Sequence, residues 1–248
     1  MVHAAHDTRL DRLVALKLLP SSLVADQEWR HSFWREAYCA SLAAHPHVAM
    51  VFDVGEADEI PFLAMELVDG QSLKALLASQ LPLDAARALA IARMIAGGLA
   101  RVHAQGVVHR DIKPDNVMVA RDGTIKLVDF GIAKPLWWTD APFAEHRPQQ
   151  DDHSASRTGR VVGTAAYMAP EQAYGGEVDL RADIYATGVL LRELWGAVRP
   201  SRGIPADLAA LVQRCLETDP ERRFPDAGAL QLALGGLKPW PPSRATAG

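Results

Sequence analysis

The segment from His109 to Asp129 restricts the fold of this 248-residue chain more than any other segment. Its second half holds two short apolar stretches, Val117–Ala120 and Ile125–Val128, joined by a polar turn that includes Asp-Gly. Asp-Gly between alternating apolar residues is a strong signal for a β-hairpin. A hairpin would place Asn116 at its beginning and Asp129 at its end, so both side chains would face one point. The sequence therefore predicts a polar site at the open end of a hairpin.

The first half of this segment reads His109-Arg110-Asp111-Ile112-Lys113-Pro114-Asp115-Asn116-Val117. The Asp111 carboxylate can accept a proton from a hydroxyl, and the Lys113 ammonium can neutralise a phosphate in transfer. The carboxamide of Asn116 and the carboxylate of Asp129 can hold a metal ion. Groups of these kinds at these spacings suit phosphoryl transfer. The alternative is a solvated charged turn, which does not account for three such groups followed by Asp-Phe-Gly.

Composition narrows the class of protein. Apolar residues make up 49% of the chain and charged residues 23%, ordinary values for a soluble globular protein. The net charge of −4 gives no reason to expect a nucleic-acid partner. No apolar run approaches the ~18 residues that span a bilayer, and the first residues are too charged for a secretory signal. We therefore expect a cytoplasmic protein without a membrane span, whose cysteines are buried and not disulfide-bonded.

The order of apolar patterns predicts two parts of different character. The residues before Asp69-Gly70 predict a small sheet with one helix, and those after it are mainly helical. Asp84 is expected to cap a long helix that Gly106 closes at its C-terminal end. The predicted strands are 13–19, 48–54, 62–68, 117–120 and 125–128, and the predicted helices are 26–44, 85–104, 181–195, 206–217 and 226–234.

Further motifs stand in order along the chain. They are Val14-Ala15-Leu16-Lys17, Met65-Glu66-Leu67-Val68, Val128-Asp129-Phe130-Gly131, Gly163-Thr164-Ala165-Ala166-Tyr167-Met168-Ala169-Pro170-Glu171 and Asp219-Pro220-Glu221-Arg222-Arg223-Phe224. Together with the run at 109–117, they resemble the eukaryotic-like serine/threonine protein kinases, most closely those of bacteria. The resemblance extends over about residues 2–234, nearly the whole chain.

The resemblance implies an α+β fold with two lobes. Residues 1–68 would form a small β-rich N-lobe with one helix, and residues 69–237 a larger, mainly helical C-lobe. The activation segment would span residues 129–171, and residues 238–248 would be a Pro-rich disordered tail. The implied function is transfer of the γ-phosphoryl group of ATP, with Mg²⁺, to Ser or Thr hydroxyls of protein substrates.

The resemblance also assigns roles to individual residues. Asp111 and Lys113 would be catalytic, and a lysine two positions after the aspartate resembles the serine/threonine-specific branch. Asn116 and Asp129 would be the Mg²⁺ ligands. The residues that would bind ATP, through its phosphates, its adenine edge or its adenine ring, are Lys17, Glu36, Ala15, Met65, Glu66, Val68 and Met118.

Three structural contacts follow from the same resemblance. Lys17 would pair with Glu36 on the N-lobe helix, because an unpaired buried ammonium is costly. Glu171 would pair with Arg223. Asp183 would hold the backbone of the catalytic loop.

In the kinases that this chain resembles, an arginine before the catalytic aspartate, here Arg110, goes with activation by phosphorylation. A phosphate brings a charge of about −1.5 to −2, which a guanidinium can bind through two hydrogen bonds. The candidate acceptors are Thr158 first and Ser156 second, with Ser154 behind them. Unmodified loop hydroxyls are the alternative. The resemblance also allows self-association for autophosphorylation.

The sequence departs from this resemblance in several places. Val2 would be the last residue of the family's Gly-rich motif, so that loop and its strand are expected on a missing upstream piece, with a real loss as the alternative. The kinases that this chain resembles usually have a further helix, helix G, in this part of the chain. Residues 196–204 are too short and too rich in Gly and Pro to form it. Trp137-Trp138 would pack on the protein's own cleft or anchor a partner. A real loss would favour a rival function, a pseudokinase that binds nucleotide or acts as a scaffold. The segment Gly163–Glu171 argues against a small-molecule phosphotransferase.

Overall fold

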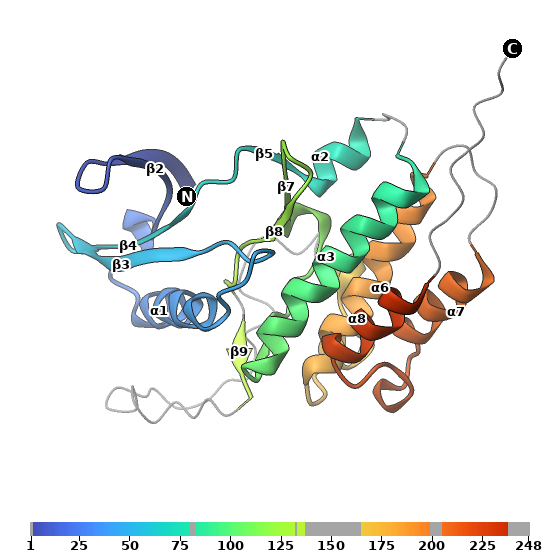
Figure 1. The fold of residues 1–248 in the computed structure, drawn as a ribbon. Helices are drawn as coiled ribbons and strands as arrows, with labels where there is room; N and C mark the ends of the chain where they lie inside the picture. Colours follow the sequence, from blue (N-terminus) through green and yellow to red (C-terminus); the bar gives the residue numbers. More distant parts are fainter. Residues whose placement is uncertain (1, 80–82, 132, 137–164, 199–204, 238–248) are drawn as a thin grey trace, which may run out of the picture.

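The computed structural model describes residues 2–79, 83–131, 133–136, 165–198 and 205–237, which form two lobes (Figure 1). The smaller lobe, drawn in blue, contains a β-sheet and one helix. The larger lobe, drawn in green to red, is mainly helical. This is the α+β, two-lobed arrangement that the sequence predicts.

The sheet of the smaller lobe is antiparallel and has the strand order β1-β2-β4-β3. Its strands are β1 (Val2–Asp7), β2 (Arg12–Leu18), β3 (Val51–Ala57) and β4 (Ile60–Glu66). Strand β1 was not among the predicted strands. Its sequence, VHAAHD, has little apolar alternation, and it forms because all of its residues pair with β2 in register.

Helix α1 (Gln27–Leu42) covers one face of this sheet. Asp26 caps it, since its carboxylate accepts hydrogen bonds from the backbone N–H groups of Glu28 and Trp29. The inner face of the helix buries Phe33 and Ala37 in an apolar cluster with side chains from the sheet side. The other face of the same turn carries Glu36 toward the larger lobe.

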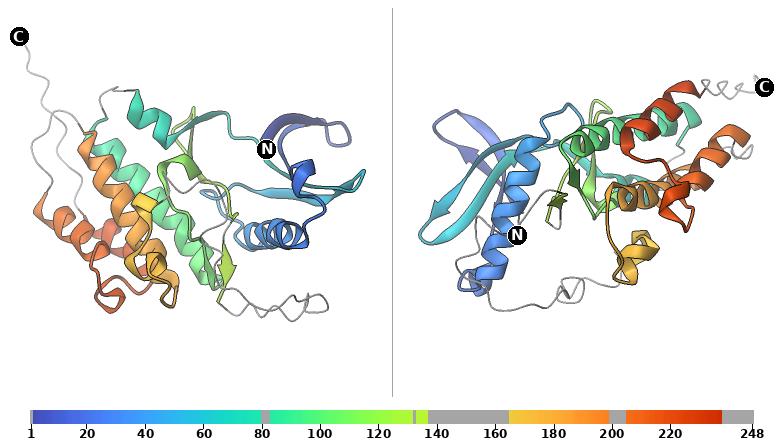
Figure 2. Two further views of the ribbon diagram at one scale, coloured as in Figure 1. Left: turned by 180° about the vertical axis from the view of Figure 1, so that it is seen from behind. Right: turned by 90° about the horizontal axis from the view of Figure 1, so that it is seen from below.

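The larger lobe is built on helix α3 (Ala85–Ala104), against which α6 and α8 lie (Figure 2). The other helices are α2 (Leu73–Ala78), α5 (Pro170–Ala173), α6 (Leu180–Gly196), α7 (Ala206–Cys215) and α8 (Ala227–Gly236), with 3-10 turns at Ser21–Leu23, Pro114–Asn116, Ala165–Tyr167 and Pro220–Arg222. Short strands add β5 (Gly70–Ser72), β7 (Val117–Ala120) and β8 (Ile125–Leu127), and pair β6 (Val107–Val108) with β9 (Lys134–Pro135). Within the described residues, no helix is both long and apolar enough to cross a membrane.

Helix α3 has the bounds that its end signals predict. The Asp84 carboxylate accepts a hydrogen bond from the backbone N–H of Arg87 at 2.7 Å. Gly106, just beyond the helix, has a φ of 67°, the left-handed conformation that glycine adopts at low cost. The predicted hairpin is also present, as β7 pairs with β8. Helices α6, α7 and α8 begin and end within two residues of their predicted bounds.

The backbone joins the lobes in two places. The first is the chain itself, which leaves β4 and enters the larger lobe through residues 67–69. The second is a pair of backbone hydrogen bonds at β8, where Ala49 N–H donates to Leu127 O and Leu127 N–H donates to His47 O, both at 2.9 Å. This second attachment explains why the strand predicted at 48–54 begins later, as β3, since the backbone at Ala49 is bound to the larger lobe.

Candidate active site

The side chains of Lys113 and Asn116 gather around Asp111, between β6 and β7. Lys113 Nζ lies 2.8 Å from Asp111 Oδ1 and 2.6 Å from Oδ2. Asn116 Nδ2 donates to Asp111 Oδ2 at 2.8 Å and to its backbone oxygen at 2.9 Å. The carboxylate is therefore held from two sides. The structure brings together the three groups that the sequence singled out in this loop.

A second cluster forms around Lys17 on β2. Its Nζ lies 2.5 Å from Glu36 Oε1 on α1 and 2.9 Å from Asp129 Oδ1, just after β8. The ion pair between Lys17 and Glu36 that the sequence predicts is thus present. The same ammonium also reaches across to the larger lobe, so one cation connects three elements.

Burial and charge shift the pKa values of this cluster. Burial raises the pKa of Glu36 to about 7, against the attraction of Lys17 and with the help of the nearby Asp129 charge. Burial also opposes ionisation of Asp129, but the Lys17 ammonium outweighs it and the pKa of Asp129 is lowered. The two carboxylates outweigh burial at Lys17, whose pKa is raised. Of the two carboxyl groups, Asp129 therefore ionises more readily than Glu36.

Asn116 and Asp129 are tied together by the backbone. Val128 N–H donates to Asn116 O at 3.0 Å, which closes the open end of the hairpin and brings the two residues together. Asp129 has a φ of 63°, a left-handed conformation for a residue with a side chain. The donor set fits Mg²⁺, because Asp129 supplies an ionised carboxylate and the Asn116 amide, whose nitrogen faces Asp111, supplies an oxygen.

The backbone of the predicted catalytic loop is held by Asp183 on α6. The Oδ2 atom accepts from His109 N–H and the Oδ1 atom from Arg110 N–H, both at 2.7 Å. Arg110 has a φ of 67°, so these bonds stabilise a strained conformation directly before Asp111. Asp183 is fully buried, and burial raises its pKa, but hydrogen bonds and nearby histidines outweigh this and the pKa is lowered.

The predicted pair of Glu171 and Arg223 is also present. The guanidinium donates to Glu171 Oε1 at 2.6 Å and Oε2 at 2.8 Å. Arg223 is buried between α5, α6 and the turn before α8. This pair fixes α5 to the core of the larger lobe.

The residues predicted to surround adenine lie on both sides of the lobe junction. Ala15 on β2 and Met65 on β4 are direct neighbours in the sheet register. Met118 lies on β7 in the larger lobe, and Val68 lies in the connection between the lobes. The structure thus brings Ala15 next to Met65, and it places Met118 across the junction from them.

Comparison with known proteins places this arrangement in a family. The family model described as protein kinase domain matches residues 1–206. The chain belongs to the protein kinase family. Its relatives include a probable serine/threonine-protein kinase from Streptomyces coelicolor, 35% identical over 99% of this chain, and serine/threonine-protein kinase PknD from Mycobacterium tuberculosis, 37% identical over 94%. This kinase spans only 39% and 37% of the length of those two proteins.

A solved structure agrees with the sequence comparison. The PknI kinase domain of Mycobacterium tuberculosis is 30% identical, with a TM-score of 0.70 over 94% of this chain and 89% of that one. The two-lobed kinase fold predicted from the motifs is therefore confirmed.

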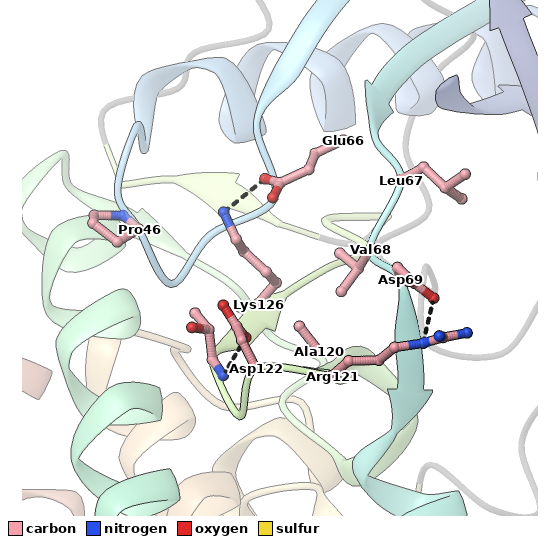
Figure 3. A pocket seen from close by; sticks show the side chains of 10 residues that line it. Pro46, Glu66, Leu67, Val68, Asp69, Ala120, Arg121, Asp122 and Lys126 are labelled. Carbon is pink, nitrogen blue, oxygen red and sulfur yellow. Dashed lines mark hydrogen bonds and ion pairs between the residues drawn. The ribbon is translucent and has the colours of Figure 1, made fainter. Parts of the chain in front are cut away.

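The side chain of Glu66 points toward Lys126, beside the segment that connects the lobes of this kinase (Figure 3). Its Oε2 atom lies 2.7 Å from Lys126 Nζ and accepts from Met50 N–H at 3.2 Å. It lines an open pocket of about 510 Å³, together with Arg121 and Asp69, which form an exposed ion pair. The adenine contact predicted for Glu66 is through its backbone and stays a prediction, and its side chain joins the lobes.

Several predicted features lie outside the described residues. They are the phosphorylation candidates Thr158, Ser156 and Ser154, the Trp137-Trp138 pair, residues 199–204 of the shortened segment, and the tail 238–248.

Two residues at the site were not singled out from the sequence. Lys126 holds Glu66 across the lobe junction, and His103 at the end of α3 contacts Asp183 at 3.0 Å. A lone histidine in an apolar helix gives no signal beyond core packing. The only available clue was its position four residues after Leu99 on a face that is otherwise buried and apolar.

Proposed function

We propose that this kinase transfers the γ-phosphoryl group of ATP, with Mg²⁺, to Ser or Thr hydroxyls of proteins. The observation that carries the proposal is the joining of two clusters at the lobe junction. Asp111, Lys113 and Asn116 form one, and Lys17 with Asp129 forms the other, with the Val128–Asn116 backbone bond between them. The relatives named as serine/threonine-protein kinases support the choice of acceptor.

In this proposal Asp111 is the catalytic base. Lys113 and Asn116 fix the direction of its carboxylate, so one oxygen can accept the proton of a substrate hydroxyl as that oxygen attacks phosphorus. Lys113 is close enough to Asp111 to hold the γ-phosphate at the same point. Catalysis then consists of positioning and charge neutralisation, as phosphoryl transfer requires.

Asn116 and Asp129 are the proposed Mg²⁺ ligands. When bound, the ion neutralises charge on the phosphate oxygens during transfer. Lys17 is the proposed contact to the α- and β-phosphates, and Glu36 keeps its ammonium in place. Because Lys17 contacts both Glu36 and Asp129, a shift of α1 would misplace the cation.

The adenine ring is proposed to lie between Ala15 and Met118, beside Met65. The backbone of Glu66 and Val68 would bind its edge. The side-chain bonds of Glu66 to Lys126 and to Met50 N–H support this role, because they hold the lobe connection in one conformation.

We place the functional boundaries as follows. The N-lobe comprises residues 1–68, the C-lobe residues 69–237 and the activation segment residues 129–171.

The reaction belongs in the cytoplasm, where Mg-ATP is supplied. The two thiols, Cys39 and Cys215, are free and buried, which fits a reducing compartment.

The test is a phosphotransfer assay on the complete polypeptide that carries these residues, with Mg-ATP and a general protein acceptor. We expect phosphoserine or phosphothreonine to form, and Asp111→Asn to lower kcat by about 10²- to 10⁴-fold. ATP binding, measured by calorimetry, is expected to survive that substitution. Undiminished transfer in Asp111→Asn would remove Asp111 from the mechanism, and ATP binding without any transfer in the unaltered protein would indicate a pseudokinase.

Phosphorylation in the activation segment is the proposed means of regulation, with Thr158 as first acceptor and Ser156 as second. Arg110, directly before Asp111, is the proposed phosphate contact. Mass spectrometry after incubation with Mg-ATP is expected to find phosphate on residues 151–162. Phosphate found only outside that range would contradict the assignment.

A further inference from the structure

Lys74 and Asp115 form an ion pair beside the predicted catalytic loop. Lys74 lies in the first turn of α2, and Asp115 lies on the 3-10 turn at 114–116. The Nζ atom of Lys74 lies 2.8 Å from Asp115 Oδ1, and the two side chains are 66% and 43% exposed. The turn buries Asn116, whose amide contacts Asp111, and leaves Asp115 exposed. Asp115 therefore faces solvent four residues after Asp111.

The segment that contains Tyr167 lies beside the same loop. Gln172 of α5 donates from its Nε2 atom to Arg110 O at 3.2 Å. Tyr167 donates from its hydroxyl to Glu193 Oε2 at 2.6 Å. Burial and the Glu193 carboxylate raise the pKa of Tyr167, and the negative charge of Asp115 raises it further. The charge of Asp115 therefore acts in the space between the loop and this segment.

A protein substrate brings its own charges to this space. Its hydroxyl has to reach Asp111, and neighbouring residues of a chain are about 3.8 Å apart, so the residues that flank the hydroxyl come within reach of Asp115. An unpaired Asp115 carboxylate would attract a basic side chain among them. In this kinase the carboxylate is already bound by Lys74.

The exposed pair is better suited to selection than to stability. Exposed ion pairs add little to folding stability, because water screens the charges and two flexible side chains lose freedom. Discrimination between ligands uses repulsive as well as attractive contacts. The Lys74 ammonium neutralises Asp115 and repels a second cation at the same point. A substrate cation therefore meets a like charge where the carboxylate alone would bind it.

We propose that Lys74 is a specificity-determining residue, which selects against protein substrates that carry Arg or Lys at the position that reaches Asp115. Substrates with a neutral or an acidic residue at that position are accepted, because the ammonium does not repel them. The inference rests on the proposed function, since it concerns the residues that flank the acceptor hydroxyl. Lys74 is not a catalytic residue, because it acts on these flanking residues and not on the hydroxyl or the phosphate.

The test compares the binding of short peptides to the complete polypeptide, measured by fluorescence polarisation with Mg-ATP present. Alanine replaces the acceptor residue, so that binding is measured without transfer. Each peptide carries Arg, Ala or Glu at one position on either side of the acceptor. We expect the unaltered protein to bind the Arg peptide more weakly than the Ala peptide at one position. In Lys74→Gln the ratio of Arg to Ala affinity at that position is expected to rise about tenfold, because one repulsion is removed and one attraction is formed.

Two further variants identify the cause of this change. Lys74→Gln combined with Asp115→Asn is expected to lose the gain for Arg peptides, because no carboxylate is left to bind them. Arg121→Gln is the matched control, since Arg121 forms an exposed ion pair with Asp69 beyond the other end of β7. Its ratio of affinities is expected to equal that of the unaltered protein. The substituted side chains are all exposed, so the variants are expected to fold.

The proposal is overturned if Lys74→Gln leaves the ratio unchanged at every position, if Arg121→Gln changes it equally, or if the gain survives the loss of the Asp115 carboxylate. Absence of peptide binding to the unaltered protein would overturn it as well. The same peptides with serine as acceptor test transfer separately. If they receive no phosphate but the ratio changes as expected, the proposed function fails and the selection by Lys74 stands. If they are phosphorylated but the ratio does not change, only the selection fails.

Discussion

Replacing Arg223 with methionine is expected to destabilise the larger lobe severely, because this side chain uses every N–H of its guanidinium. Two bonds go to Glu171, and three go to the backbone oxygens of Glu217, Arg181 and Thr218 at 2.8 to 3.1 Å. Arg223 is only 2% exposed. Methionine has a similar length and fills most of the volume, so the loss comes from the bonds and not from a cavity.

The size of the destabilisation follows from the buried charge of Glu171, which the substitution leaves without its partner. Removing one partner of a buried ion pair costs about 3–5 kcal/mol, because the remaining charge has neither water nor a partner. In a chain of this size each kcal/mol lowers Tm by about 2–4 °C. We therefore expect Tm to fall by at least about 6 °C. Arg223→Lys is expected to recover only part of this, since an ammonium has three donors and no planar fork.

Urea denaturation followed by circular dichroism measures the change in unfolding free energy. The matched control is the neighbouring Arg222→Met. That side chain is 71% exposed and lies 3.7 Å from Glu217, so its loss is expected to change stability by no more than about 0.5 kcal/mol. In the double variant Arg223→Met with Glu171→Gln, the loss of unfolding free energy is expected to be smaller than the sum of the losses in the two single variants. Equal effects of the two arginine substitutions would refute the reasoning.

Three further predictions concern buried groups. Asp183→Asn is expected to be less stable than the unaltered protein at pH 7, with the gap in urea stability narrowing as pH falls below about 4, because a lowered pKa gives stability that protonation removes. Gly188→Ala is expected to lower the free energy of unfolding by about 1–3 kcal/mol, because its new Cβ would lie 2.6 Å from Cys215 Cβ. Gly196→Ala is the control and is not expected to destabilise the protein, because its new Cβ would point into open space. Alkylation by iodoacetamide at pH 8 is expected to be slow in the folded protein and fast in urea, because burial raises the pKa of Cys39 to about 11 and of Cys215 to about 12.

The parts of the fold that local signals specify could be predicted from the sequence. Helix α3 has an acidic cap at Asp84 and a glycine at 106, and the structure begins and ends it there. The β7–β8 hairpin has its own turn residues. Strand β1 could not be predicted, because only its pairing with β2 makes it a strand. Likewise helix α2 has only six residues and depends on the Ser72 cap.

At the candidate site too, short-range motifs could be predicted from the sequence, and contacts between distant residues could not. The motifs gave the identities of Asp111, Lys113 and Asn116, whose spacing along the chain is short. They could not give the second contact of Lys17 with Asp129, which joins residues 112 positions apart. Nor could they show which way the Glu66 side chain points, since this depends on Lys126 meeting it from the other lobe.

The attachments between the lobes limit how the cleft can open. Besides the connection at residues 67–69 and the backbone bonds between Ala49 and Leu127, the ion pairs of Lys17 with Asp129 and of Glu66 with Lys126 cross between the lobes. The C-terminal part of helix α1 is also packed into the apolar core of the larger lobe through Cys39, Ala40 and Ala43. A swing that moves the N-terminal end of α1 away from the larger lobe therefore has to break the Lys17–Asp129 pair, and it changes the reach of Glu36 toward that lobe.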